Sequence, residues 1–190
     1  NMKKIISFFI VACCAMCATA AKVVWQIGVA DNSGTELALG PSEYKKFLAH
    51  DFGYEDRYFL VGTSVDKNDF PYVLPGPDDT WGGTWSTSGW RTHDANILFG
   101  IKKLPKHGKW KLVVDLVDAN PSRSVVKVMV NSAEKKFEIK GHSKGVLEGN
   151  LQDAKEQILE FPISANDLKK GGNMVTVSVL EGGWIVFDQI

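Results

Sequence analysis

The residues with the clearest potential for chemistry lie in one aromatic-rich segment, residues 66–92. Indole and phenol rings alternate there with carboxylates and one guanidinium, at Tyr72, Asp78, Asp79, Trp81, Trp85, Trp90 and Arg91. An indole face stacks on the C–H face of a sugar ring, while carboxylates and guanidinium groups hydrogen-bond to hydroxyls. These residue types predict a ligand-binding loop for sugars. The alternative is that the tryptophans are buried and hold the loop against the fold.

Catalytic chemistry has weaker support in the sequence. Asp78 with Asp79 and Glu55 with Asp56 are adjacent acidic pairs, but neighbouring side chains on a strand or loop point apart. The two acids of a glycoside hydrolase must face each other about 5–9 Å apart across the substrate. The chain also has no Gly-x-Ser-x-Gly, phosphate-loop or dinucleotide-binding motif. We therefore predict no catalytic residue, and an enzyme domain in its own right stays open as an alternative.

Histidines and acidic residues form no metal-binding pattern in the sequence. The four histidines are scattered, with no His-Glu-x-x-His motif, at positions His50, His93, His107 and His142. Asp31 with Asn32 and Asp118 with Asn120 offer oxygen ligands of the kind that calcium prefers. Because EF-hand spacing is missing, these residues are expected to form turns. The sequence predicts no metal and no cofactor, and it gives no support for a structural calcium ion.

Charge is balanced along the chain, with 22 basic against 22 acidic side chains. A nucleic-acid-binding protein needs a basic patch to neutralise phosphates, and no basic run here is long enough to form one. We therefore expect no nucleic-acid partner.

The first twenty residues have the three-part layout of a secretory signal peptide. Lys3 and Lys4 form a positively charged start, an apolar run follows over 5–16, and Ala18-Thr19-Ala20 supplies the small residues of a cleavage site. The run is too short for a membrane span, which takes about 20 apolar residues. We expect a secreted or periplasmic protein with no transmembrane segment. Acylation of Cys13 in a lipoprotein-type motif is the alternative to cleavage after Ala20.

The positions of the cysteines limit how the mature domain can be stabilised. All three, Cys13, Cys14 and Cys17, lie inside the predicted signal peptide, so a chain cleaved after Ala20 has no disulfide and relies on its hydrophobic core. About 170 residues suffice for one domain, which we assign to 22–190. The chain ends on an apolar strand pattern at Ile190, and we expect the natural protein to continue beyond it.

Short runs of β-branched and aromatic residues, separated by Gly, Pro, Asn and Asp, indicate strands. We predict them over 22–29, 57–62, 94–104, 109–117, 125–131, 135–139, 157–163, 174–180 and 184–190. Two short helical segments are expected, at 44–50 and as a single turn after Ser164. This pattern favours an all-β fold, a β-sandwich with one or two short helices.

The order of several short motifs resembles one known family. Trp25-Gln26-Ile27-Gly28, Arg57-Tyr58-Phe59-Leu60-Val61-Gly62 and Asp69-Phe70-Pro71-Tyr72 are similar to the third, C-terminal domain of rhamnogalacturonan lyases, polysaccharide lyase family 4. Later motifs agree with it: Asn96 to Ile101 with Trp110-Lys111-Leu112, Val128 to Asn131, Leu168 to Asn173, and Phe187-Asp188-Gln189-Ile190. The resemblance covers residues 23–190.

This resemblance implies a galactose-binding-like, carbohydrate-binding-type domain with a jelly-roll sandwich. The expected function is that of a non-catalytic module in a secreted polysaccharide-degrading enzyme, acting on a pectin-type substrate. Its partners would be a polysaccharide or oligosaccharide and a catalytic domain of the same chain, whose parent is a lyase or a glycoside hydrolase. Here the module follows the signal peptide directly, whereas in those lyases it follows the catalytic domain. A purely structural domain that packs on a catalytic domain stays open.

Overall fold

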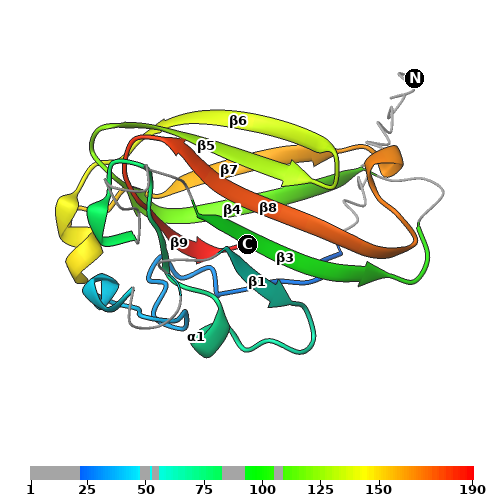
Figure 1. The fold of residues 1–190 in the computed structure, drawn as a ribbon, viewed down its shortest axis with the longest axis horizontal. Coiled ribbons are helices and arrows are strands. Elements are labelled where there is room, and N and C mark those ends of the chain that lie inside the picture. Colours follow the sequence, from blue (N-terminus) through cyan, green and yellow to red (C-terminus); the bar gives the residue numbers. More distant parts are fainter. Residues whose placement is uncertain (1–21, 48–51, 53–55, 83–92, 105–108) are drawn as a thin grey trace, which may run out of the picture.

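Apolar residues alternate with polar ones along most strands, so that one face of each strand is apolar. The strands form two sheets that pack against each other (Figure 1). The computed structural model describes residues 22–47, 52, 56–82, 93–104 and 109–190. The strands are β1 (Arg57–Leu60), β2 (Val73–Leu74), β3 (Asp94–Ile101), β4 (Trp110–Ala119), β5 (Arg123–Val130), β6 (Ala133–Lys140), β7 (Gln157–Ile163), β8 (Gly171–Glu181) and β9 (Ile185–Gln189).

The two sheets are built from strands that are mostly distant in sequence. One sheet has the order β1-β3-β8-β5-β6 and the other β2-β9-β4-β7. β1 runs parallel to β3, and the other strand pairs of the two sheets are antiparallel. The prediction of an all-β sandwich is confirmed.

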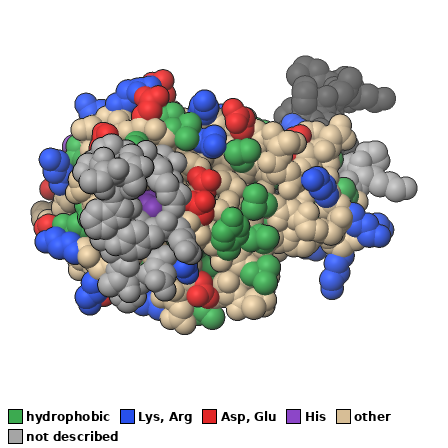
Figure 2. Space-filling view, viewed as in Figure 1, with side chains coloured by type: hydrophobic (Ala, Val, Ile, Leu, Met, Phe, Trp, Pro, Cys, Tyr) green, Lys and Arg blue, Asp and Glu red, His purple; other side chains and the backbone are tan. Residues whose placement is uncertain are grey.

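One hydrophobic core fills the space between the sheets. Ile97 of β3 and Val177 of β8 come from the first sheet, and Val114 and Leu116 of β4 from the second; none of the four has any exposed surface. These residues lie on the faces that period-two alternation assigns to the interior. Outside the core, exposed hydrophobic side chains such as Tyr58 and Met174 lie on the surface, and Figure 2 shows several gathered on one face.

The helical segments are short, as expected. They comprise α1 (Asp66–Asp69) and the 3-10 turns η1 (Tyr44–Lys46), η3 (Thr80–Gly82), η4 (Lys144–Glu148) and η5 (Ala165–Asp167). The predicted turn after Ser164 is η5, which Ser164 caps together with Asp167 in a capping box. The predicted helix at 44–50 begins as η1, and residues 48–50 lie outside the described part.

Two segments differ from the expectation. Residues 22–29 do not form a strand: Ile27 exchanges two backbone hydrogen bonds with Ile190, and Gly28 makes one isolated bridge to Gln189. Residues 66–82, expected to lack regular structure, contain α1, β2 and η3. A sequence window cannot reveal β2, because two residues become a strand only by pairing with β9.

The two ends of the sandwich are distinct. At one end, η3 and η4 lie beside the start of β9; at the other, β3 and β7 finish and β4 and β8 begin (Figure 1). Among the residues that the structure describes, no helix has both the length and the apolar character needed to cross a bilayer.

Candidate functional site

Tyr72, the first residue of the predicted sugar-binding loop, is part of the core. Its side chain is 1% exposed, and its hydroxyl donates a 2.8 Å hydrogen bond to the carbonyl oxygen of Leu147. Burial raises the pKa of the phenol well above its usual range, so the hydroxyl stays protonated. Tyr72 thus connects the segment before β2 to the η4 turn, and its ring has no solvent-facing surface for a sugar.

Asp78 and Asp79 are neighbours with different environments. Asp78 is exposed, and its backbone N–H donates to the carbonyl oxygen of Gly182. Asp79 is buried, and its carboxylate accepts a 2.9 Å hydrogen bond from the Gly76 N–H. Burial raises the pKa of Asp79 to about 6, against the lowering effect of its backbone donors. Of the two, Asp78 is available to a hydroxyl from solvent.

Trp81 lies in η3 and is half-buried. Its ring meets Tyr44 at 5.2 Å and Phe47 at 5.9 Å, both with near-perpendicular planes. Edge-to-face packing of this kind fixes the indole against the rest of the fold. Part of its surface stays exposed. The other predicted site residues, Trp85, Trp90 and Arg91, lie outside the described residues, so their role stays a prediction.

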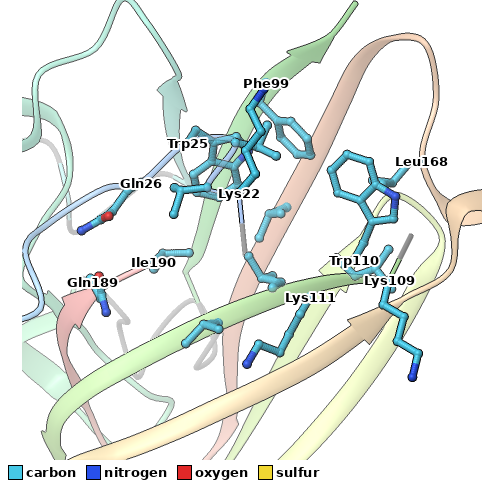
Figure 3. Close-up of a pocket in the computed structure, with 16 residues that line it drawn as sticks. Lys22, Trp25, Gln26, Phe99, Lys109, Trp110, Lys111, Leu168, Gln189 and Ile190 are labelled. Atoms are coloured by element: carbon cyan, nitrogen blue, oxygen red, sulfur yellow. The ribbon is translucent and has the colours of Figure 1, made fainter. Parts of the chain in front are cut away.

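A cavity of about 390 Å³ lies toward the other end of the sandwich (Figure 3). Both sheets contribute to it, with Phe99 and Val175 from the first and Leu112 and Ile163 from the second. Leu112, Val175, Leu168 and Ile190 are buried members of its apolar lining. The cavity therefore lies between the two sheets and is partly open to solvent.

Two tryptophans line this cavity from different elements. Trp25 comes from the segment before Ile27 and packs against Phe99, with ring centroids 5.3 Å apart. Trp110 begins β4, and in Figure 3 the Phe99 ring is drawn between the indoles of Trp25 and Trp110. Both indoles are half-buried, so each keeps some surface toward the opening. The result is an aromatic-walled cavity.

Polar groups lie around the rim of the cavity. Gln26 is exposed and Gln189 is half-buried, and both line it. The Gln26 amide donates to the carbonyl oxygen of Gly28 at 3.0 Å, and the Gln189 amide donates to Asp115 at 3.4 Å. Lys22, Lys109 and Lys111 also line it, and no acidic residue lines it within the part of the chain that the structure describes. The ammonium of Lys111 pairs with Glu160 at 2.5 Å, and in Figure 3 the Lys109 and Lys111 ammonium groups point away from the rings. The rim thus combines hydrogen-bonding amides with aliphatic lysine stems.

An apolar cavity with a few polar groups at its edge is the usual form of a small-molecule site. Sequence reasoning missed this one because Trp25, Phe99 and Trp110 are far apart in the chain and each lies on an apolar strand pattern that predicts core. A weak signal was present: both tryptophans lie near the beginning of a run, where a sandwich strand reaches the edge of the core.

The acidic residues considered as calcium ligands have other partners. Within the described ranges, no three His, Cys, Asp or Glu side chains gather in a way that would hold a metal ion. Asp31 instead accepts from the Ser33 N–H and hydroxyl in a turn, and Asn120 accepts from the Ser122 N–H in another. The turn role is confirmed for Asp31 and Asn120, whereas Asp118 accepts from backbone N–H groups of the distant residues His142, Ser143 and Lys155.

Known proteins that are similar to this chain include an enzyme and a solved structure. The chain is 23% identical over 181 residues to the rhamnogalacturonate lyase of Dickeya dadantii (strain 3937), matching 90% of this chain and 27% of that protein. It thus spans about a quarter of the length of this relative. The solved structure is a family GH115 4-O-methyl-alpha-glucuronidase with specificity for decorated arabinogalactans. It is 19% identical to this chain with a TM-score of 0.33, and the match covers 50% of this chain and 12% of that protein. This similarity is too low to support an argument.

The family comparison covers nearly the whole described region. The matching model is CBM-like, polysaccharide lyase family 4, domain III, and the match runs over residues 23–190. It includes both tryptophans of the cavity and every strand of the two sheets. The resemblance inferred from the short motifs is confirmed. By its sequence over 23–190 and its two-sheet fold, this chain belongs to the CBM-like domain III family of polysaccharide lyase family 4.

Proposed function

We propose that this chain is a non-catalytic carbohydrate-binding module that binds pectin-type oligosaccharides in the cavity between Trp25 and Trp110. The observation that carries the proposal is the placement of two half-buried indoles and the Phe99 ring around one cavity whose rim bears amide groups. Pyranose rings need both elements, because their C–H faces stack on aromatic rings and their hydroxyls need hydrogen-bond partners.

Family membership supports the choice of ligand. The similar protein from Dickeya dadantii is named a rhamnogalacturonate lyase, so pectic polysaccharide is the first ligand class to test. Among the described residues, those that line the cavity include no carboxylate, and the general acids of glycoside hydrolases are Asp or Glu. A binding role therefore fits this cavity better than hydrolysis by paired acids.

The proposal also covers the compartment in which the module acts and the domain with which it acts. We infer that it acts outside the cytoplasm, because the first twenty residues have the layout of a signal peptide. We also infer a catalytic domain as its partner, because the chain corresponds to about a quarter of the length of its lyase relative. In this setting the module would hold polysaccharide close to the catalytic centre.

The tryptophan-rich segment is a second candidate surface for the same ligand. Exposed Asp78 and half-buried Trp81 are its described members, and Trp85, Trp90 and Arg91 complete the predicted loop. Its described part, in η3, lies at the end of the sandwich where β9 begins (Figure 1), whereas the cavity is lined by the start of β4 and the end of β7. The two surfaces can therefore be tested independently by substitution.

Titration of tryptophan fluorescence with pectic oligosaccharides tests the proposal. We expect saturable binding, and we expect Trp110→Ala to weaken it at least tenfold, a loss of about 1.4 kcal/mol. Trp110→Phe keeps an aromatic face and should retain more of the affinity. Trp81→Ala tests the tryptophan-rich segment in the same way. Affinity that falls in Trp81→Ala and stays unchanged in Trp110→Ala would place the binding site in that segment.

A purely structural module is the competing function. It predicts no change in fluorescence or heat on adding pectic oligosaccharides at millimolar concentration, with the wild-type chain shown to be folded by circular dichroism. That result would contradict carbohydrate binding at both surfaces.

A further inference from the structure

We infer that the end of the sandwich that holds the cavity selects acidic saccharide chains over neutral ones, because lysines around the cavity pair with carboxylates of the chain. This inference rests on the proposed carbohydrate-binding function and adds to it the charge of the ligand. We call this group of lysines the lysine end; its members are Lys102, Lys103, Lys109, Lys111, Lys169 and Lys170.

Strand pairing brings two of these lysines together from separate parts of the chain. Ile101, the last residue of β3, is the register partner of Gly171, the first residue of β8. Lys102 follows Ile101 and Lys170 precedes Gly171, and both lysines line one open depression of the surface. Their ammonium groups can therefore meet the same ligand.

Other lysines adjoin the proposed binding cavity. Lys109 and Lys111 line it on either side of Trp110 in the sequence, and Lys22 lines it from the segment before Trp25. In Figure 3, Lys22 lies beside Trp25, whereas Lys109 and Lys111 lie on the side of Trp110. A saccharide that stacks on the indoles would thus have lysines on both sides.

The positive charge of the lysine end is only partly balanced by nearby acids. All six of its lysines are exposed, and among the described residues Lys111 is the member with an ion-pair partner, Glu160. Asp167 is half-buried, and its carboxylate accepts the backbone N–H of Ser164 in the cap of η5. Glu134, at the start of β6, is exposed and is followed by two further lysines. Figure 2 shows basic side chains gathered at the end where β3 finishes.

This distribution gives the molecule a charge asymmetry. The whole chain has 22 basic and 22 acidic side chains, so an excess of lysine at one end leaves an excess of acid elsewhere. A site surrounded by charge of one sign raises the local concentration of ligands of the opposite sign. Each exposed ion pair contributes little by itself, but a chain with a carboxylate on several sugar residues can meet several lysines at once. A neutral chain gains none of this energy.

A matched pair of probes tests the inference by calorimetric titration. One probe is an oligogalacturonate of defined length, and the other is the same oligosaccharide with its carboxyl groups reduced to alcohols, which keeps the rings and linkages and removes the charge. At low salt we expect the acidic probe to bind about tenfold more tightly. Raising sodium chloride from about 0.02 M to about 0.5 M should remove most of this difference, because salt screens exposed charges. Affinity for the neutral probe should not depend on salt.

Paired variants connect the selectivity to the lysine end. Lys102→Gln combined with Lys170→Gln should weaken binding of the acidic probe about fivefold and leave the neutral probe unaffected. Lys144→Gln combined with Lys155→Gln is the matched control, because it removes two exposed lysines from the loop between β6 and β7, at the other end of the sandwich. This control changes the net charge equally and should keep both affinities within about twofold.

Each outcome bears on a different claim. Equal affinity for the acidic and the reduced probe at low salt would overturn the inference and leave carbohydrate binding intact. No binding of either probe would overturn the proposed function and the inference with it. Equal losses in the two double variants would show that net charge, and not the lysine end, attracts the ligand. Poly-glutamate, which has carboxylates and no sugar rings, is the third probe; affinity equal to that of the oligogalacturonate would overturn selection of a saccharide.

Discussion

At the scale of single residues, Asp79 is a buried carboxylate between two exposed neighbours, Asp78 and Thr80. Its side chain is 9% exposed, and its carboxylate accepts a hydrogen bond from the backbone N–H of Gly76, within the predicted loop. Burial raises its pKa to about 6, whereas an unfolded aspartate ionises near its ordinary value of about 3.9. Its protonation is therefore coupled to folding and affects how firmly the loop is held.

The sign of this coupling gives a prediction. Between about pH 4 and pH 6 the folded state keeps the proton that the unfolded state has lost, so the contribution of Asp79 to stability falls as pH rises. The difference of about two pKa units corresponds to roughly 3 kcal/mol. We expect Asp79→Asn to remove this part of the pH dependence, measured as the free energy of unfolding in urea from pH 4 to pH 7.

The same experiment contains its own control. Asp188 is another buried acid with a raised pKa, and it titrates in both proteins, so only the difference between wild type and variant reports on Asp79. Parallel curves for the two proteins over this pH range would contradict the coupling.

At the scale of elements, the loop between β6 and β7 is organised by one carboxylate at the end of β4. Asp118 has no exposed surface. It accepts hydrogen bonds from the backbone N–H groups of Ala119, His142, Ser143 and Lys155, at 2.8, 2.9, 2.9 and 3.3 Å. Close packing reinforces this junction: a Cβ on Gly141 would lie 1.6 Å from the carbonyl oxygen of Ala119.

Removing this carboxylate should destabilise the whole domain. Asp118→Ala leaves four backbone donors without their acceptor, each of them costing about 1–3 kcal/mol when buried. Because water can reach part of the loop, we expect a loss of about 3–5 kcal/mol in the free energy of unfolding. Urea denaturation followed by circular dichroism measures it.

Asp153→Ala is the matched control, since Asp153 is an exposed acid in the same loop. It should change stability by less than about 0.5 kcal/mol. Similar values for the two variants would mean that Asp118 does not organise the loop.

At the scale of the whole molecule, both sheets share one hydrophobic core and so should unfold together. Ile97 of the first sheet and Leu116 of the second are fully buried in it. We expect Ile97→Ala and Leu116→Ala each to cost about 2–5 kcal/mol, through lost burial and the cavity left behind. In each variant, tryptophan fluorescence and far-ultraviolet circular dichroism should give the same unfolding midpoint. Separate midpoints would show that the sheets are independent units.

The sequence alone determined the class of fold, most of the strands and the family. Alternation of apolar residues depends only on neighbours along the chain, so the inward faces of β3 and β4 could be assigned correctly. The strand predicted at 157–163 coincides with β7. Short motifs in a fixed order, from Trp25 to Ile190, were enough to identify the family.

Only the tertiary structure decided where binding surfaces lie. Tyr72 belongs to the same aromatic-rich segment as Trp81, yet it is buried because its hydroxyl meets Leu147, 75 residues away. Trp25, Phe99 and Trp110 come together because the segment before Ile27 pairs with the end of β9, while β3 and β4 belong to opposite sheets. Such neighbours are set by strand order and by the packing of two sheets, which link residues distant along the chain.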